Sequence, residues 1–489
     1  SRFNAKIHEE GSQVMALWGG RFSQSPADSV FALSRSVQFD WRLAPYDLVA
    51  SMAHVRALHR GSIIDSATAE ALNQALKDLA GDISSGRFAP IAEDEDVHTA
   101  LERGLIGKIG EQGGAIRAGR SRNDQVVTAF KLYLMDAMTE IADLLSTLST
   151  ALLSRAEEHA DTIAPGFTHL QHAQPISFGH ELAKHAVSLE RDIDRIQDWL
   201  TRTNFSPLGS GALAGSSLPL TPEVTGQELG FDGVVRNSID AVSDRDFVAE
   251  ALFVIASIGV HLSRIGEEWT LWSSTEFGWA TIDDAYATGS SIMPQKKNAD
   301  VAELARGKAG RFIGNLTAML ATMKGLPFAY NRDLQEDKEV TFSSVENLLT
   351  LLPPLTGMIE TTEFHTEVMA AAAPAGFSLA TEIADFLVRK GIPFSIAHEA
   401  AGRCVKICEE QGKELHQLSD SELTSVHSAL DPEVKKFLHA KNAIESRISI
   451  QGTSPASVRN QIASLRSAFL THGEWISRAR TRFSGMMSL

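Results

Sequence analysis

The chain has 489 residues, enough for about three domains of ordinary size. Apolar residues make up 43% of the chain and charged residues 22%, which excludes the disordered, collagen-like and disulfide-scaffold classes of protein. The formal net charge is -16. Affinity for polyanions depends on Lys and Arg neutralising phosphates, so this charge argues against nucleic acid as a partner.

Three further features of the sequence concern the cellular location of the protein. The first fourteen residues lack the apolar segment of a signal peptide, so we expect residues 1–14 to be a tail or a cloning remnant. The most apolar stretch, residues 249–262, is interrupted by Ser257, Gly259 and His261 and is too short to cross a bilayer. Cys404 and Cys408 are the two cysteines of the chain. We expect them to be reduced, buried thiols of a cytoplasmic protein that does not enter a membrane.

In chain order, residues 15–119 mix short amphipathic helices with turns and are expected to form an N-terminal domain. Apolar residues then recur at alternating spacings of three and four, which predicts long helices. These helices are expected over 124–160, 178–200, 244–269, 304–320 and 345–355, and Asp244 is the expected N-cap of the third. Residues 120–368 are therefore expected to form a central bundle, and residues 369–489 a smaller helical domain.

The fold class expected is all-α, with an elongated central helical bundle and smaller N-terminal and C-terminal helical domains. Residues 249–265 carry few charges on any face of their helix. A bundle formed by one chain would leave part of this apolar helix exposed to solvent, so we expect the helix to pack against helices of other subunits. The long glycine-rich connections at 206–217 and 288–298 are expected to be functional loops.

One of these loops, Gly289 to Asn298, reads GSSIMPQKKN. It combines serine hydroxyls, two lysines and an amide. This set suits a reaction in which a carboxylate gathers charge while a neighbouring carbon loses its proton. A solvated basic loop is the alternative interpretation, and the full ten-residue string makes it the weaker one.

A second cluster is Thr168-His169-Leu170-Gln171-His172, which follows the helix breakers Pro165 and Gly166. Histidine exchanges protons near neutral pH, so acid–base chemistry is possible here, although a single histidine is more often structural. A zinc site at His180, Glu181 and His185 fails on spacing. The order is HExxxH rather than HExxH, which turns the second histidine off the shared helix face.

The third cluster, Gly119 to Gln125, reads GRSRNDQ and begins the first long helix. Arginine offers paired donors to a carboxylate, and a helix N-terminus adds free backbone N–H groups, although an ordinary helix cap is an alternative. The string GSGALAG at 209–215 misses the dinucleotide-binding pattern by one residue, and the chain contains no P-loop. The sequence therefore lacks both of the motifs that usually indicate a nucleotide cofactor.

Together these strings resemble the fumarase/aspartase superfamily, whose members cleave C–N or C–O bonds and release fumarate. Gln295 to Asn298, GRSRNDQ, Thr168 to Gln171 and the opening Trp18 to Phe22 are similar to the argininosuccinate lyase family in particular, to which the δ-crystallins are related. The resemblance runs from Met15 to the C-terminus. The chain departs from the usual family residues at Ala118, Phe167, His172 and Ala299, which puts loop stiffness and substrate affinity in doubt.

The resemblance implies reversible β-elimination of argininosuccinate to L-arginine and fumarate, with no organic cofactor and no metal. It implies that Ser290 is the base, that Lys296 and Asn298 hold the reacting carboxylate, and that His169, oriented by Glu303, is the acid. Binding of the succinyl end is implied for Ser121, Arg122, Asn123 and Thr168. Binding of the arginine end is implied for Ser36, Tyr330, Gln335 and Lys338, and Arg245 is a further expected substrate contact.

The resemblance also implies a homotetramer in which each site is shared between subunits. Two alternative functions of other classes remain. One is a superfamily lyase that acts on another fumarate-yielding substrate, such as adenylosuccinate. The other is a noncatalytic structural protein like the δ-crystallins, which retained residues alone do not exclude.

Overall fold

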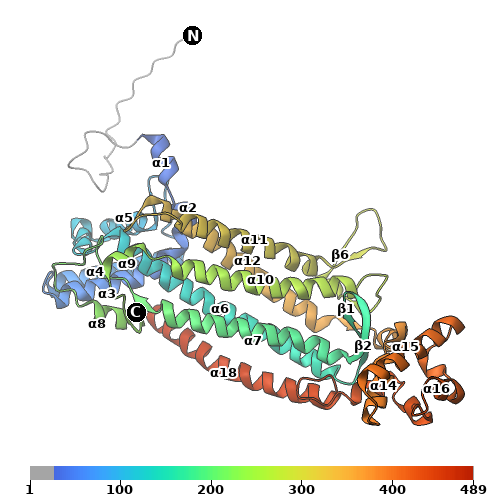
Figure 1. Cartoon of the computed structure of the whole chain (residues 1–489). Coiled ribbons are helices and arrows are strands. Elements are labelled where there is room, and N and C mark those ends of the chain that lie inside the picture. The colour runs from blue at the N-terminus through green and yellow to red at the C-terminus, as the bar shows by residue number, and fades with distance from the viewer. Residues whose placement is uncertain (1–26, 488–489) are drawn as a thin grey trace.

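The structure, a computed structural model, describes residues 27–487 of the chain. The expected tail and the Trp18 to Phe22 string lie outside these residues. The described chain begins with short helices that pack around one end of a long bundle (Figure 1). These elements are α1 (Asp28–Ser34), α2 (Val37–Asp40), η1 (Trp41–Leu43), α3 (Ala44–Arg60), α4 (Ser66–Ser84), α5 (Val97–Ile109) and η2 (Gly110–Arg117).

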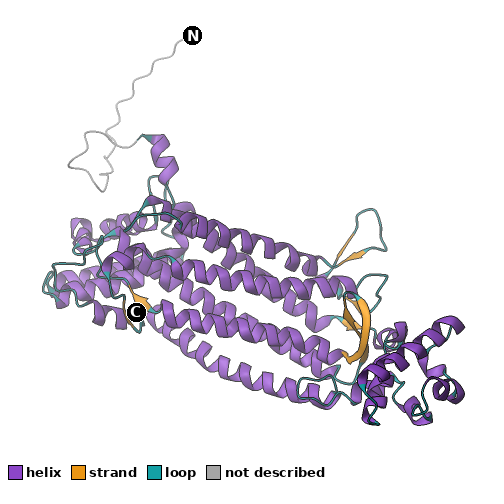
Figure 2. Ribbon diagram, viewed as in Figure 1, coloured by secondary structure: helices purple, strands orange, loops and turns teal. Residues whose placement is uncertain are grey.

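Long helices lie side by side and make the molecule elongated (Figures 1 and 2). They are α6 (Arg122–Glu158), α7 (Phe178–Thr203), α10 (Asp246–Trp272), α11 (Asp300–Met323), α12 (Asp337–Thr361) and α18 (Pro455–Met487). Their apolar seams meet in one buried core that also includes residues of α3 and α4. The all-α bundle expected from the apolar spacing is confirmed.

Short elements connect the long helices. Pairs of strands form the antiparallel hairpin β1 (Ile163–Thr168) and β2 (Gln171–Ser177), the parallel pair β3 (Phe205–Ser206) and β4 (Gly233–Val234), and the antiparallel pairs β5 (Ala280–Thr281) with β8 (Glu363–Phe364) and β6 (Thr288–Gly289) with β7 (Lys297–Asn298). The remaining connectors are α8 (Pro222–Glu228), α9 (Ser238–Ser243), η3 (Asp284–Tyr286) and η4 (Arg332–Glu336).

A second buried core lies in the C-terminal part of the chain and joins residues between Leu379 and Ala443. Its elements form a separate lobe at one end of the bundle (Figure 1). The elements from residue 366 to 445 are α13 (Thr366–Ala372), η5 (Ala375–Phe377), α14 (Ala380–Arg389), α15 (Phe394–Gln411), η6 (Leu415–Gln417), α16 (Asp420–Val426), η7 (Pro432–Lys436) and α17 (Ala440–Glu445). Helix α18 returns along α6 and α7 and shares the main core. The segment 369–489 therefore contributes to both cores, and the domain boundaries stay a prediction.

Helix α10 covers the range expected from the apolar spacing and differs from the expectation at its N-cap. The N-cap is Arg245, one residue after the expected Asp244, whose carboxylate accepts a hydrogen bond from the backbone N–H of Asp246 at 2.6 Å. The helix has 27 residues and is long and apolar enough by composition to cross a membrane, although the apolar stretch within it was expected to be too short. His261 lies within it, and its imidazole Nδ1 is 2.6 Å from the Asp192 carboxylate. Since 61% of its most apolar window is buried within the chain, α10 behaves as a core helix.

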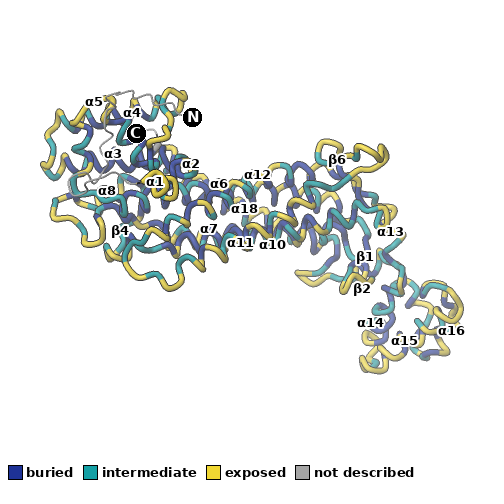
Figure 3. Tube along the Cα trace, turned by 90° about the horizontal axis from the view of Figure 1, so that it is seen from above, coloured by how far each residue is buried: buried dark blue, intermediate teal, exposed yellow. Residues whose placement is uncertain are grey.

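Part of the α10 and α11 surface remains apolar and exposed. Phe253 on α10 is 51% exposed, and Leu304, Ile313 and Leu320 on the adjacent α11 are similarly exposed. Figure 3 shows that exposed positions recur along these long helices between the two ends of the bundle. Exposed large apolar side chains on neighbouring helices typically mark surfaces for interaction.

Candidate active site

A cavity of about 210 Å³ lies where the short N-terminal helices meet α6 and α12. Its lining brings together residues from four separate parts of the sequence. The residues expected at a substrate site that line it are Ser36, Arg122, Asn123, Tyr330, Gln335 and Lys338. The structure therefore places these six side chains around one cavity, although they span some 300 positions of the chain.

The start of α6 is held in place by its own polar residues. Ser121 is the N-cap, and its hydroxyl accepts a hydrogen bond from the Asn123 N–H at 3.2 Å, while Asp124 accepts from the Ser121 N–H at 3.0 Å. The other Asp124 oxygen accepts from the N–H groups of Gly209 and Gly211. The glycine-rich segment thus wraps this helix end and fixes the N-terminus from which Arg122 and Asn123 reach the cavity.

Carboxylates that were not expected from the sequence also line this cavity. Asp40 is buried and accepts from the Ser36 hydroxyl at 2.6 Å and from the Val97 N–H at 2.9 Å. Burial raises the pKa of Asp40 to about 6, against the opposite effect of the hydrogen bond from Ser36. Glu95 and Asp96 line the cavity as well, and their string Glu93-Asp94-Glu95-Asp96 was the sequence signal that could have found them.

Lys338 is the buried cation of the cavity. Its ammonium Nζ lies 2.8 Å from the Asp337 carboxylate and 5.3 Å from the centre of the Phe130 ring. The other Asp337 oxygen accepts from Arg245 Nε at 2.6 Å. Arg245 does not line this cavity, and its Nη1 donates to the carbonyls of Val242 and Asp244. The structure therefore places Arg245 behind Lys338, on the shared partner Asp337, and its expected contact with substrate stays a prediction.

The loop with Ser290, Lys296 and Asn298 lies at the opposite end of the bundle, where β6 and β7 project beyond the helices (Figure 1). The Ser290 hydroxyl accepts hydrogen bonds from the N–H groups of Ile292 and Met293, at 3.3 and 3.1 Å. The Lys296 side chain is exposed and forms no hydrogen bond or ion pair within residues 27–487. The loop thus offers the Lys296 ammonium to its surroundings, whereas the Ser290 hydroxyl is held by the backbone of its own loop.

Thr168 and His169 lie exposed at the tip of the β1–β2 hairpin, which is near the same end of the bundle as the Ser290 loop (Figure 1). His169 and Leu170 form the turn with left-handed backbone, φ 56° and 55°. Non-glycine residues rarely adopt this conformation, and strain of this kind tends to occur at functional sites. Glu303, expected to orient His169, is exposed in the first turn of α11, and neither side chain has a hydrogen-bond partner in the described part of the chain.

The expected site residues therefore fall into groups at two ends of one chain. Helix α11 separates the Ser290 loop from Tyr330, and its 24 residues span about 36 Å at 1.5 Å per residue. A substrate that spans a single site cannot touch both groups within one copy. The structure brings together the residues expected at the arginine end and part of the succinyl end, and it leaves Thr168, His169, Ser290, Lys296, Asn298 and Glu303 apart from them.

Most of the chain is similar in sequence to known lyases. Residues 20–314 match a family model described as "Lyase", and residues 377–445 match one described as "Argininosuccinate lyase C-terminal". The argininosuccinate lyase of Frankia casuarinae is 57% identical over 94% of this chain and 99% of its own length. The chain belongs to the argininosuccinate lyase family. The enzyme of that name from Saccharopolyspora erythraea is 54% identical over 94% of this chain and 96% of its own length.

Solved structures agree with this family assignment. An EDDS lyase in complex with formate has a TM-score of 0.83 and 28% identity, covering 94% of this chain and 92% of its own. The class II fumarase of Schistosoma mansoni, at 16% identity and a TM-score of 0.71, covers 82% of this chain and 90% of its own and shares the fold. The sequence-based assignment to the argininosuccinate lyase family and to its superfamily fold is confirmed.

Proposed function

We propose that this member of the argininosuccinate lyase family catalyses the reversible β-elimination of argininosuccinate to L-arginine and fumarate. The observation that carries the proposal is full-length identity of 57% to a protein of that name, together with the cavity that gathers six residues expected to bind substrate. A structural neighbour, an EDDS lyase variant 27% identical to this chain with a TM-score of 0.83, covers 95% of this chain and 95% of its own and was solved with bound fumarate. That product supports a fumarate-releasing reaction on this fold.

In the proposed reaction, the Ser290 oxygen removes the proton from Cβ of the succinyl group. The electron pair of that C–H bond becomes delocalised into the adjacent carboxylate before the C–N bond breaks. Two backbone N–H groups point at the Ser290 oxygen, and this supports the role because they stabilise negative charge there. Lys296 and Asn298 hold the carboxylate as its charge grows.

When the C–N bond breaks, the guanidino nitrogen leaves with the bonding electrons and needs a proton. His169 supplies it, with Glu303 as its orienting partner. Its exposed position at a strained hairpin turn supports the assignment, since the imidazole is free to meet a substrate on another copy of the chain. No organic cofactor or metal ion is needed in this scheme.

The cavity at the opposite end of the bundle binds the arginine end of the substrate, which carries a cationic amine, a carboxylate and the guanidino group. Lys338, Arg122 and the amide of Gln335 suit carboxylates, whereas Asp40, Glu95 and Asp96 suit cationic groups. Ser121, Asn123 and Thr168 complete the contacts to the succinyl end. The mixed charge of the lining matches a zwitterionic substrate better than a simple dicarboxylate.

We propose that each site is assembled from several copies in a homotetramer. Two observations support this. The catalytic loop and the cavity lie about one helix length apart in a single chain, and the apolar positions Phe253, Leu304, Ile313 and Leu320 give α10 and α11 a surface for another copy. Antiparallel packing of copies along this surface would bring opposite ends of two bundles together. The cytoplasmic location inferred from buried Cys404 and Cys408 stays a prediction.

An assay of fumarate release, followed by its ultraviolet absorbance, tests this function. With argininosuccinate as substrate, the purified full-length chain should release fumarate and arginine in equal amounts. With adenylosuccinate it should not. Turnover of adenylosuccinate alone would assign the chain to another superfamily lyase, and no turnover of either substrate by a correctly assembled tetramer would favour a δ-crystallin-like structural role.

A further inference from the structure

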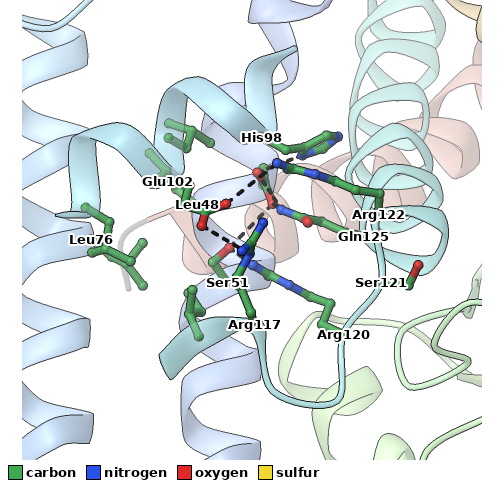
Figure 4. Close-up of a pocket in the computed structure, with 14 residues that line it drawn as sticks. Leu48, Ser51, Leu76, His98, Glu102, Arg117, Arg120, Ser121, Arg122 and Gln125 are labelled. Carbon is green, nitrogen blue, oxygen red and sulfur yellow. Dashed lines mark hydrogen bonds and ion pairs between the residues drawn. The ribbon is translucent and has the colours of Figure 1, made fainter. Parts of the chain in front are cut away.

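A second cavity, of about 420 Å³, lies beside the substrate cavity between α3, α4, α5, η2 and the start of α6 (Figure 4). Its size falls within the range of about 300–1,000 Å³ typical of small-molecule sites. The two cavities share His98 and Arg122 among their lining residues and no others. The second cavity is thus a neighbour of the substrate cavity, and it is also lined by Ser121, a proposed contact of the succinyl end.

One part of this cavity is apolar. Five buried side chains, each at most 5% exposed, contribute to it: Leu48, Leu76, Leu101, Leu105 and Ile116. They come from helices α3, α4 and α5 and from η2. A ligand with a short aliphatic chain would gain hydrophobic free energy from contact with them.

The other part is cationic, because Arg117, Arg120 and Arg122 all line the cavity (Figure 4). Arg117 lies 3.1 Å from a Glu102 carboxylate oxygen, and Arg122 lies 3.7 Å from the other. Arg120 donates to the Ser51 hydroxyl at 2.9 Å and forms no ion pair within residues 27–487. Arg120 is half-buried, and the carboxylates of Asp47 and Glu102 also line the cavity without forming an ion pair with it. Its guanidinium therefore has donors beyond the one bonded to Ser51 that an anion could accept.

A histidine nitrogen without a hydrogen-bond partner lies in the wall between the two cavities. The His98 imidazole is 4% exposed, and its Nδ1 lies 2.9 Å from the Asp47 carboxylate. Its Nε2 is buried and has no hydrogen-bond partner. Buried polar atoms are seldom left unpaired, which indicates that a ligand or water completes this wall.

We propose that this second cavity binds a small aliphatic monocarboxylate, with its carboxylate on Arg120 and its chain against the leucine side chains. Inorganic phosphate would satisfy Arg120 but would leave the apolar part unused. The bound carboxylate would also attract Arg122, which the two cavities share. Occupancy should therefore weaken substrate binding and raise KM, while kcat stays nearly constant.

Calorimetric titration of the full-length protein with hexanoate, in the absence of substrate, tests the binding independently of the reaction. We expect one saturable site per chain, and butyrate should bind more weakly by about fourfold for each methylene removed. Arg120→Met should lower the hexanoate affinity at least tenfold. Arg403→Met, a substitution of an exposed arginine on α15, is the matched control and should leave the affinity unchanged.

Leu76→Phe tests the apolar side without removing a charge, and it should also weaken hexanoate because it fills the cavity. In kinetic assays, hexanoate should raise KM in the wild type and in Arg403→Met but not in Arg120→Met. Hexanoate affinity that survives both Arg120→Met and Leu76→Phe, or that is lost in Lys338→Met instead, would overturn the proposal. The second pattern would place the ligand in the substrate cavity.

Discussion

Arg245 and Asp337 form a fully buried ion pair, with 2.6 Å between Arg245 Nε and Asp337 Oδ2 and side chains that are 1% and 0% exposed. Asp337 also holds the Lys338 ammonium at 2.8 Å. The pair joins the start of α10 to the start of α12 behind the cavity proposed to bind substrate. It therefore links the packing of the bundle to the position of a proposed binding residue.

Asp337→Asn should destabilise the fold by about 3–5 kcal/mol, because it leaves a buried guanidinium without its counter-charge. The same change should raise KM, since Lys338 loses the carboxylate that positions it. Thermal unfolding at fixed protein concentration measures the first effect. Glu410→Gln, which removes an exposed partner of Lys406, is the control and should cost less than about 1 kcal/mol. Equal Tm values for the two variants would refute a stabilising role for the buried pair.

Shared sites predict complementation between inactive chains. Ser290→Ala and His169→Asn should each be nearly inactive alone. If Ser290 and His169 reach each site from different copies, then random co-assembly at equal amounts leaves roughly a quarter of the sites with both residues intact. Co-expression with two different tags, followed by purification of the mixed oligomer, should recover about that share of wild-type activity. Were both residues supplied by one copy, no site would be intact and no activity would return.

The pKa of Asp40 predicts a pH dependence of stability. Burial raises it from an ordinary value of 3.8 to about 6, so between these values the folded state binds more protons than the unfolded state. The contribution of Asp40 to the free energy of unfolding is therefore fully present below pH 3.8 and is lost as the pH rises through about 6. At pH 8 the charged Asp40 costs about 3 kcal/mol by this shift, since one pKa unit is worth about 1.36 kcal/mol.

Asp40→Asn retains a carbonyl oxygen for the Val97 N–H and removes the charge. The Tm of this variant relative to wild type should therefore be higher at pH 8 than at pH 4.5. A difference between the two proteins that does not change over this range would mean that Asp40 titrates normally. KM should rise in the variant at both pH values if Asp40 contacts a cationic part of the substrate.

The long helices could be predicted because their packing is encoded locally, in apolar residues three and four positions apart. The β1–β2 hairpin could not, since its two-residue turn is formed by His169 and Leu170 with positive φ, where the usual signal is asparagine or glycine. The expected N-cap of α10 lies one residue before the observed one for a related reason. Asp244 has the chemistry of an N-cap, but Arg245 occupies the position and turns its side chain toward Asp337.

Part of the cavity lining could be predicted from the sequence, through the family resemblance at Ser36, Arg122, Asn123, Tyr330, Gln335 and Lys338. Asp40 could not, because it becomes a lining residue through contact with Val97, 57 positions away. The roles expected for Ser290, Lys296 and His169 stay predictions. Nothing in the sequence indicated that Arg245 pairs with Asp337, 92 positions away on another helix. Its expected contact with substrate stays a prediction.

Ser290→Ala should lower kcat by at least about 10²–10⁴-fold, the range for a lost general base, and leave the fold and the assembly unchanged. Ser290 lies in a loop that projects beyond the helices and belongs to neither buried core, so the substitution should leave the fold intact. Its hydroxyl accepts hydrogen bonds from two backbone N–H groups, whereas the neighbouring Ser291 side chain forms no hydrogen bond in the described chain. Ser291→Ala is therefore the matched control, with near-normal turnover expected under saturating argininosuccinate. Activity lost in Ser291→Ala and kept in Ser290→Ala would move the base by one residue, and activity in both variants would remove the loop serine from the mechanism.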